Sequence, residues 1–260
     1  MAADVPALAC SGVEVRFGGV RALDGAGFEA APGRISAVIG PNGAGKTTLL
    51  NAVTGMVEQQ AGGIELFGRD ITRLAPHERA RDGVVRTFQN LEVFSNLSVL
   101  ENVMTGCHAR VRYSPLHGLL RTPKFWRAEA RIRELAEQEL EFAGLSELAN
   151  DPAGDLPFGG QRLLELARAL AGGPRLLLLD EPAAGLNIKE TQSLGRLITR
   201  IRDERGVSIV LVEHDMDLVM HVSDQVAVLS FGKVIAAGTP REVQSNREVI
   251  KAYLGEEDDE

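Results

Sequence analysis

The chain has 260 residues, a net charge of −8 at pH 7 and two cysteines. Its length suits one large α/β domain, or one core with a smaller inserted lobe. The acidic balance argues against nucleic acid as the main partner, because duplex binding depends on neutralising phosphates, and the sequence separation of Cys10 and Cys107 indicates neither a disulfide framework nor a zinc site.

The N-terminal stretch Met1–Leu8 lacks the basic-then-apolar pattern of a signal peptide. No apolar run approaches the roughly 18 residues needed to cross a bilayer. We therefore expect a cytoplasmic protein that reaches a membrane only where a partner holds it.

Alternating apolar and polar residues from Leu8 to Phe28, with glycines between them, predict short antiparallel strands joined by turns. Phe17 lies within this segment, upstream of a glycine-rich loop. Its flat ring could stack on adenine, or it could be a half-buried strand residue, and the sequence favours neither interpretation.

The glycine-rich loop follows the apolar run Ile35–Ile39 and precedes the helical run Thr48–Val53. Its sequence is Gly40-Pro41-Asn42-Gly43-Ala44-Gly45-Lys46-Thr47-Thr48. The pattern of Gly, four residues and Gly-Lys-Thr predicts a phosphate-binding loop, because its backbone N–H groups can point at one anion while Lys46 adds positive charge. Thr47 offers a hydroxyl to Mg²⁺, and the helix N-terminus favours phosphate. The alternative is a glycine-rich turn that binds nothing.

Strands are predicted at 62–67 and 82–89, and the second ends at the polar pair Gln89-Asn90. Between residues 91 and 155 strand signals vanish and apolar positions recur at helical spacing, which predicts an inserted helical lobe. The lobe carries a block of basic residues between 108 and 133. A solvated helical face is the default interpretation, and contact with a partner or an anionic lipid surface is the second.

After residue 155 the α/β pattern resumes. Two apolar runs, 176–179 and 207–212, read as buried strands of a parallel sheet, and they end in Asp180-Glu181 and Glu213-His214. Other elements are expected as helices at 163–170, 188–202 and 240–254, a hairpin at 226–236 and an acidic tail at 256–260.

Polar side chains at the ends of parallel strands meet along one crevice beside the phosphate loop. Asp180 is placed to hold Mg²⁺, and Glu181 can accept a proton from the water that attacks the γ-phosphate. His214 is a candidate to touch that phosphate, and Gln89 to order the water or Mg²⁺. The alternatives are a strand-end turn and a structural histidine.

The loop Gly40–Thr48, Gln89, the string Gly159-Gly160-Gln161-Arg162, the string Leu179-Asp180-Glu181-Pro182 and His214 occur in a characteristic order. In this order and spacing the chain resembles the ATP-binding subunit of ABC transporters. Finer strings, such as Ala183-Ala184-Gly185-Leu186-Asn187 and Ala252-Tyr253-Leu254-Gly255, resemble the ATPases of branched-chain amino acid importers.

The resemblance implies an α/β P-loop NTPase core with a mostly parallel sheet, an N-terminal antiparallel β subdomain and an inserted α-helical lobe. Residues 1–255 would form one domain. Its nucleotide-binding core would comprise 1–90 and 156–240, its helical lobe 91–155 and its C-terminal helix 241–255.

The resemblance also implies ATP and Mg²⁺ as ligands, with Glu181 as general base and with His214 and Gln89 as further catalytic residues. Thr47, Gln89 and Asp180 would serve the metal. The nucleotide would be bound by Phe17, Gly40, Asn42, Gly43, Gly45, Lys46, Thr47, Thr48, Gly159, Gly160 and Gln161.

Implied partners are a second ATP-binding subunit, identical or homologous, in a head-to-tail dimer, and transmembrane permease subunits. A periplasmic or extracellular solute-binding protein would take part indirectly. The chain would lie on the inner face of the cell membrane and power import of branched-chain amino acids. Alternatives are an importer of urea, an amide or another small solute, a soluble ABC ATPase acting on ribosomes or DNA, and a nucleotide-sensing subunit with little catalysis.

Two positions depart from the general pattern of the class. Its usual signature is Leu-Ser-Gly-Gly-Gln, but Pro157 takes the Ser position and Phe158 the first Gly, so one hydroxyl contact is missing. Asn187 stands where an Asp is usual. Backbone N–H groups at the start of the following helix can still receive a phosphate.

Overall fold

The computed structural model describes residues 5–89, 91–111 and 122–254. The chain divides into two compact units. The sheet unit comprises Met1–Arg86, Arg175–Ala183 and Thr191–Glu260, and the helical unit comprises Thr87–Pro174 and Ala184–Glu190.

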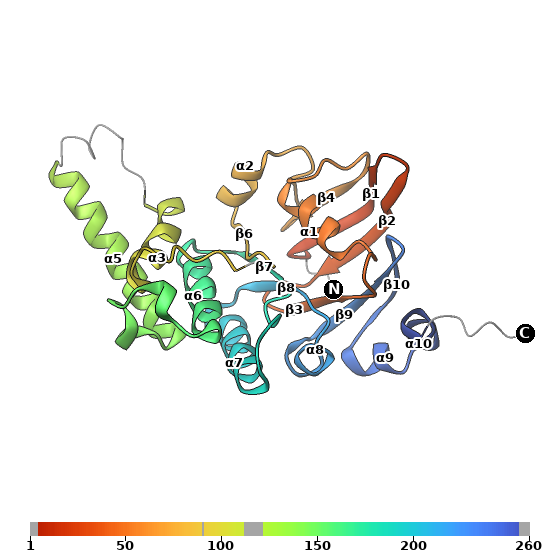
Figure 1. Ribbon diagram of the computed structural model, residues 1–260. Coiled ribbons are helices and arrows are strands. Elements are labelled where there is room, and N and C mark those ends of the chain that lie inside the picture. The colour runs from red at the N-terminus through yellow and green to blue at the C-terminus, as the bar shows by residue number, and fades with distance from the viewer. Residues whose placement is uncertain (1–4, 90, 112–121, 255–260) are drawn as a thin grey trace, which may run out of the picture. The chain divides into compact units, whose positions relative to one another are not determined.

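The larger sheet of the sheet unit has six strands in the order β10-β9-β3-β8-β7-β6 (Figure 1). Its strands are β3 (Ile35–Ile39), β6 (Val84–Arg86), β7 (Leu176–Asp180), β8 (Ser208–Val212), β9 (Gln225–Ser230) and β10 (Lys233–Gly238). All neighbours pair in parallel except β9 and β10. Every residue of β3, β7 and β8 is buried, as expected for apolar strands of a parallel sheet covered on both faces.

The smaller sheet is antiparallel, with the order β2-β1-β4-β5. It contains β1 (Leu8–Phe17), β2 (Val20–Ala30), β4 (Ala61–Leu66) and β5 (Arg69–Asp70). The expected antiparallel pairing is confirmed, but β1 and β2 have 10 and 11 residues and are not short. Register shifts along their pairing let these long strands bend.

The buried cluster of the sheet unit includes residues of both sheets and one face of α1 (Lys46–Thr54), which contributes Leu49, Leu50, Ala52 and Val53. Arg79, on α2 (Pro76–Arg81), fixes the far end of α1 by donating to the carbonyl oxygens of Ala52 and Val53. A cation is favourable there because the helix C-terminus carries partial negative charge. The helix that follows the phosphate loop is thus anchored at its base.

The helical unit contains three α-helices among its described residues, namely α3 (Val99–Gly106), α5 (Pro123–Ala143) and α6 (Phe158–Ala171). Short 3₁₀ turns also occur among its described residues, namely η1 (Cys107–Ala109), η2 (Ser146–Leu148) and η3 (Ala153–Asp155). Helix α6 packs against both α3 and α5, so the unit extends beyond the expected lobe at 91–155. The approach is close, because a Cβ at Gly106 would lie 2.1 Å from the carbonyl oxygen of Arg168.

The basic block of α5 is partly neutralised along the helix. Arg131 pairs with Glu134 at 2.6 Å and Arg133 with Glu137 at 2.9 Å, and these side chains are exposed. The observation agrees with the solvated helical face that was the default interpretation. Arg112 and Arg121 lie outside the described residues.

Four helices follow in the C-terminal part, α7 (Ile188–Arg205), α8 (Met216–Val222), α9 (Pro240–Gln244) and α10 (Arg247–Leu254). The single helix expected at 240–254 is wrong, because the chain breaks between α9 and α10, where the Asn246 side chain accepts the backbone N–H of Glu248. The strand expected at 82–89 is also shorter, at Val84–Arg86. The acidic tail lies outside the described residues. None of the described helices is both long and apolar enough to span a membrane.

Candidate functional site

Two glycines of the phosphate loop are required by its geometry. Gly40 and Gly45 have φ angles of +152° and +104°. A Cβ would lie 2.0 Å from the carbonyl oxygen of Leu229 at the first position and 2.4 Å from that of Ala22 at the second. The loop therefore packs against neighbouring backbone with no room for a side chain.

Lys46 lies inside the curve of the loop, where its Nζ donates to the carbonyl oxygens of Gly40 at 2.8 Å and Pro41 at 3.0 Å. Burial lowers the pKa of the Lys46 ammonium below its ordinary value, and the carboxylates of Glu181 and Asp180 act in the opposite direction. The Lys46 ammonium therefore interacts electrostatically with both carboxylates at the end of β7.

The N-terminus of α1 is open to an anion. Its N-cap is Gly45, which provides no side-chain hydrogen bond, so the first backbone N–H groups of the helix have no side-chain acceptor. Thr47 is exposed and Thr48 half-buried in the first turn. An N-terminus of this kind, with a lysine beside it, is suited to bind phosphate.

Asp180 ends β7 as a buried carboxylate whose two oxygens differ. Its Oδ2 accepts a hydrogen bond from Arg86 Nη2 at 2.7 Å, whereas its Oδ1 is buried without a hydrogen-bond partner. An unsatisfied buried oxygen costs free energy unless something fills its place. This oxygen is free to take a cation.

Glu181 follows in the left-handed region, with φ of +48°, and its backbone N–H donates to the carbonyl oxygen of Val212 on β8 at 2.8 Å. His214 Nδ1 lies 3.6 Å from the Glu181 carboxylate. The imidazole is 61% exposed, and the Glu181 side chain is 18% exposed. The ends of β7 and β8 therefore bring an acid and an imidazole together where both can be reached from solvent.

Glu213 is a buried carboxylate that organises the backbone between these two side chains. It accepts the N–H groups of Ala183 at 2.7 Å, His214 at 2.9 Å and Asp215 at 3.2 Å. Burial raises the pKa of Glu213 above its ordinary value, while these three donors act to lower it. The residue thus connects the loop after β7 to the loop after β8.

Two oxygen atoms in this part of the sheet unit are candidates to coordinate a metal ion. They are the exposed Thr47 hydroxyl and Asp180 Oδ1. Among the described residues, no group of three or more His, Cys, Asp or Glu side chains could hold a metal alone. One carboxylate and one hydroxyl suit a cation such as Mg²⁺, which keeps water and phosphate oxygens as its remaining ligands.

Phe17 is 52% exposed at the end of β1, which is compatible with both of its interpretations, stacking on adenine and a half-buried strand residue. Asn42 and Gly43 of the loop are exposed as well. All three remain predictions for nucleotide binding, with side chains or backbone accessible to a ligand.

The other predicted residues belong to the helical unit and are described within it. Gln89 is exposed, and its carbonyl oxygen accepts from Arg162 Nη2 at 2.9 Å. Arg162 is buried and pairs with Glu165 at 3.1 Å. The segment that carries Gln89 is therefore held to helix α6.

Gly159, Gly160 and Gln161 form the first turn of α6, whose N-cap Pro157 provides no side-chain hydrogen bond. The Gln161 side chain donates to the carbonyl oxygen of Leu156 at 2.9 Å. A Cβ at Gly159 would lie 2.8 Å from the Glu190 side chain, whose flexible end would have to move to admit it. This helix start leaves its first N–H groups available in spite of the missing Ser hydroxyl.

Asn187 has a local structural role that explains its presence. Its Oδ1 accepts the backbone N–H groups of Lys189 at 3.0 Å and Glu190 at 3.1 Å, and its own N–H donates to Glu190 Oε2 at 2.9 Å. This is a capping box at the start of α7. An asparagine at 187 therefore fulfils the N-cap role that an aspartate would have.

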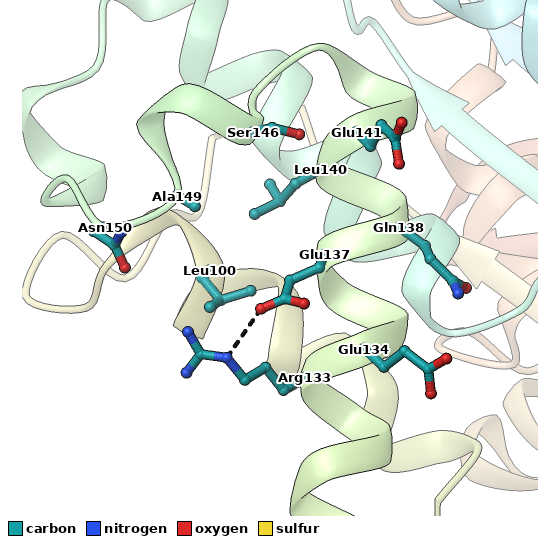
Figure 2. A pocket seen from close by; sticks show the side chains of 10 residues that line it. All are labelled: Leu100, Arg133, Glu134, Glu137, Gln138, Leu140, Glu141, Ser146, Ala149 and Asn150. Carbon is teal, nitrogen blue, oxygen red and sulfur yellow. Dashed lines mark hydrogen bonds and ion pairs between the residues drawn. The ribbon is translucent and has the colours of Figure 1, made fainter.

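Pockets also occur away from these residues. One of about 600 Å³ lies in the sheet unit beside Gly55 and Arg79, at the opposite end of α1 from Lys46. Another of about 440 Å³ lies in the helical unit, where charged side chains of α5 and Leu100 of α3 line it, and Figure 2 shows the ion pair of Arg133 with Glu137 at its wall. Neither pocket is lined by a predicted site residue.

Three residues of this region were missed by the sequence analysis, namely Arg86, Asn51 and Glu213. Glu213 ends a buried strand, and this position could have indicated its role. Arg86 and Asn51 carry no comparable signal, because Arg86 is 94 residues away from the carboxylate that it contacts.

Comparisons with known proteins match residues 23–184 to the family described as ABC transporter, and residues 233–259 to the one described as branched-chain amino acid ATP-binding cassette transporter. The chain is 46% identical over 251 residues to BraF of Pseudomonas aeruginosa, a high-affinity branched-chain amino acid transport ATP-binding protein. The aligned residues cover 96% of this chain and 98% of BraF. Identity to LivG of Escherichia coli, described in the same words, is 44% over 251 residues, with 96% and 98% covered. Among solved structures, the chain resembles the ADP conformation of MJ1267, an ATP-binding cassette of an ABC transporter, with a TM-score of 0.84 and 32% identity. The match covers 96% of this chain and 99% of the MJ1267 chain.

Proposed function

The chain belongs to the ABC transporter family of ATP-binding proteins, and we propose that it hydrolyses ATP to power the import of branched-chain amino acids through partner permeases. The observation that carries this proposal is the joint position of Lys46, Asp180, Glu181 and His214 in the sheet unit. The family match to residues 233–259 supports the class of cargo.

In the proposed reaction Lys46 and the N–H groups at the start of α1 bind the phosphates of ATP. Glu181 accepts the proton of the attacking water, since its carboxylate is reachable from solvent, and His214 contacts the γ-phosphate from the end of β8. The exposed ring of Phe17 stacks on adenine.

Thr47 and Asp180 would hold Mg²⁺, with Gln89 as a further contact. The unpartnered Asp180 Oδ1 and the exposed Thr47 hydroxyl support this assignment. When bound, the ion would neutralise charge on the phosphates.

A second ATP-binding subunit completes the site in our proposal. The uncapped start of α6, Gly159–Gln161, would face the nucleotide of that subunit, so that two chains close head to tail over two nucleotides. The assembly would sit on the inner face of the cell membrane through permease subunits, with a periplasmic or extracellular solute-binding protein delivering the cargo.

The test is reconstitution of the chain with permease subunits of a branched-chain amino acid importer, in vesicles, with cargo-loaded binding protein outside. We expect ATP hydrolysis to rise severalfold with leucine, isoleucine or valine and not with urea, and to vanish in the Glu181→Gln chain. If urea and none of the three amino acids stimulates ATP hydrolysis, the proposed cargo is wrong and urea takes its place. Absence of Mg-ATP hydrolysis in the assembled complex would contradict the enzymatic assignment.

A further inference from the structure

Arg86 joins the two elements that carry the predicted magnesium donors. Its Nη2 donates to Asp180 Oδ2 at 2.7 Å, and its Nη1 donates to Asn51 Oδ1 at 2.6 Å. Asn51 lies on α1, the helix that contains Thr47, whereas Asp180 ends β7. Arg86 itself ends β6, which pairs in parallel with β7.

This contact is closed to water. The side chains of Arg86 and Asp180 are 5% and 2% exposed. A guanidinium presents its donors in a rigid fork, so two fixed acceptors determine its position, and it in turn determines the plane of the carboxylate. Asn51 therefore orients Arg86, and Arg86 orients Asp180.

The fork occupies only one carboxylate oxygen. Asp180 Oδ1 is buried and has no hydrogen-bond partner, as expected of an oxygen reserved for another ligand. Residues that hydrogen-bond a metal-binding carboxylate fix its orientation, and losing them reduces metal affinity by roughly 10- to 100-fold.

We propose that Arg86 is a positioning residue, which holds the Asp180 carboxylate so that Oδ1 is presented to Mg²⁺, and that Asn51 anchors Arg86 to the helix of the phosphate loop. The inference rests on the proposed Mg-ATP site and deepens it. Arg86 does not touch the nucleotide; it acts through Asp180.

The experiment measures binding of a fluorescent ATP analogue to the full-length chain, first in EDTA and then over a series of Mg²⁺ concentrations. The variants are Arg86→Met, Arg86→Lys and Asn51→Ala. The matched control is Arg69→Met, which breaks another Arg–Asp pair of the same 2.7 Å length, with Asp82, in which the arginine side chain is 63% exposed.

For Arg86→Met we expect nucleotide affinity in EDTA within about twofold of wild type and a half-saturating Mg²⁺ concentration raised roughly tenfold or more. Arg86→Lys should restore part of the Mg²⁺ response, Asn51→Ala should shift it in the same direction, and Arg69→Met should leave it unchanged.

Equal half-saturating Mg²⁺ in wild type and Arg86→Met would overturn the inference while leaving the proposed function intact. Equal weakening with and without Mg²⁺ would also overturn it, because that result reports a purely structural role. If Arg86→Met does not fold, Asn51→Ala and Arg86→Lys decide in the same way. If Mg²⁺ does not change the nucleotide affinity of the wild-type chain, both the inference and the proposed metal site are overturned.

Discussion

The carboxylate of Glu213 accepts the backbone N–H of Ala183 at 2.7 Å and so ties the end of β8 to the loop that follows β7. The same carboxylate accepts the N–H of His214, whose imidazole lies 3.6 Å from Glu181. The spacing of the proposed base and the histidine therefore depends on a buried carboxylate, which itself lies 3.8 Å from the same His214 Nδ1.

Replacing Glu213 by Ala should destabilise the chain strongly. Three backbone N–H groups, one buried and two partly buried, would lose their acceptor, which we expect to lower the free energy of unfolding by about 3 kcal/mol or more. Urea denaturation would measure the change. The exposed Glu65→Ala serves as a control and should stay within about 0.5 kcal/mol of wild type; equal stability of the two variants would refute the role of the three contacts.

Replacing Glu213 by Gln should change how stability depends on pH. Because burial raises the pKa of Glu213 in the folded chain, its protonated form contributes stability that is fully present below the unfolded pKa and is lost as pH rises through the folded value. The glutamine variant cannot lose it. We expect its free energy of unfolding to improve relative to wild type as pH rises above the ordinary glutamate pKa, and parallel curves above that pH would contradict the prediction.

Glu181→Gln should separate binding from hydrolysis. An amide cannot accept the proton of the attacking water, so turnover should fall by roughly 100-fold or more. Nucleotide affinity should persist, because Lys46 and the loop are untouched. Steady-state phosphate release and equilibrium binding measure the two quantities, and continued hydrolysis in this variant would remove Glu181 from the role of base.

Gly45→Ala should abolish nucleotide binding, because its Cβ would lie 2.4 Å from the carbonyl oxygen of Ala22 and displace the loop. Gly12→Ala is the matched control, since Gly12 also has a left-handed φ, of +62°, but no atom lies within 4 Å of its added Cβ. The control should lose only about 1 kcal/mol of stability and keep its ATP affinity. Similar affinity in both variants would show that the close packing of the loop is unimportant.

Asn187→Ala should lower the free energy of unfolding by about 1 kcal/mol, because α7 loses its N-cap. Asn187→Asp keeps an acceptor at the same position and should be at least as stable as wild type. Chemical denaturation compares the three chains. A loss as large for Asp as for Ala would mean that the side chain acts through some contact other than the cap.

Local patterns predicted the elements whose physical cause is local. The runs at β3, β7 and β8 were evident because strands buried on both faces must be apolar throughout. The loop was evident because Gly45 and Lys46 stand at a spacing that phosphate binding requires. The N-cap role of Asn187 was equally local, with Glu190 three residues on, and could have been recognised from that spacing.

Contacts between distant parts of the chain were beyond such patterns. Arg86 meets a carboxylate 94 residues away, and Glu213 meets an N–H group 30 residues away. Strand pairing makes these contacts, and nothing in the residues beside Arg86 distinguishes it from a surface arginine. The break between α9 and α10 was missed because Asn246 was read as part of one continuous helix.

The helical unit is built from two stretches of sequence, and this has a practical consequence for anyone who wishes to produce it alone. A gene fragment encoding 87–174 would omit Ala184–Glu190, and with it the carboxylate side chain that fills the space above Gly159. An expression clone of the helical unit must therefore also encode Ala184–Glu190. Without this segment, the start of α6 would lack its contact with Glu190.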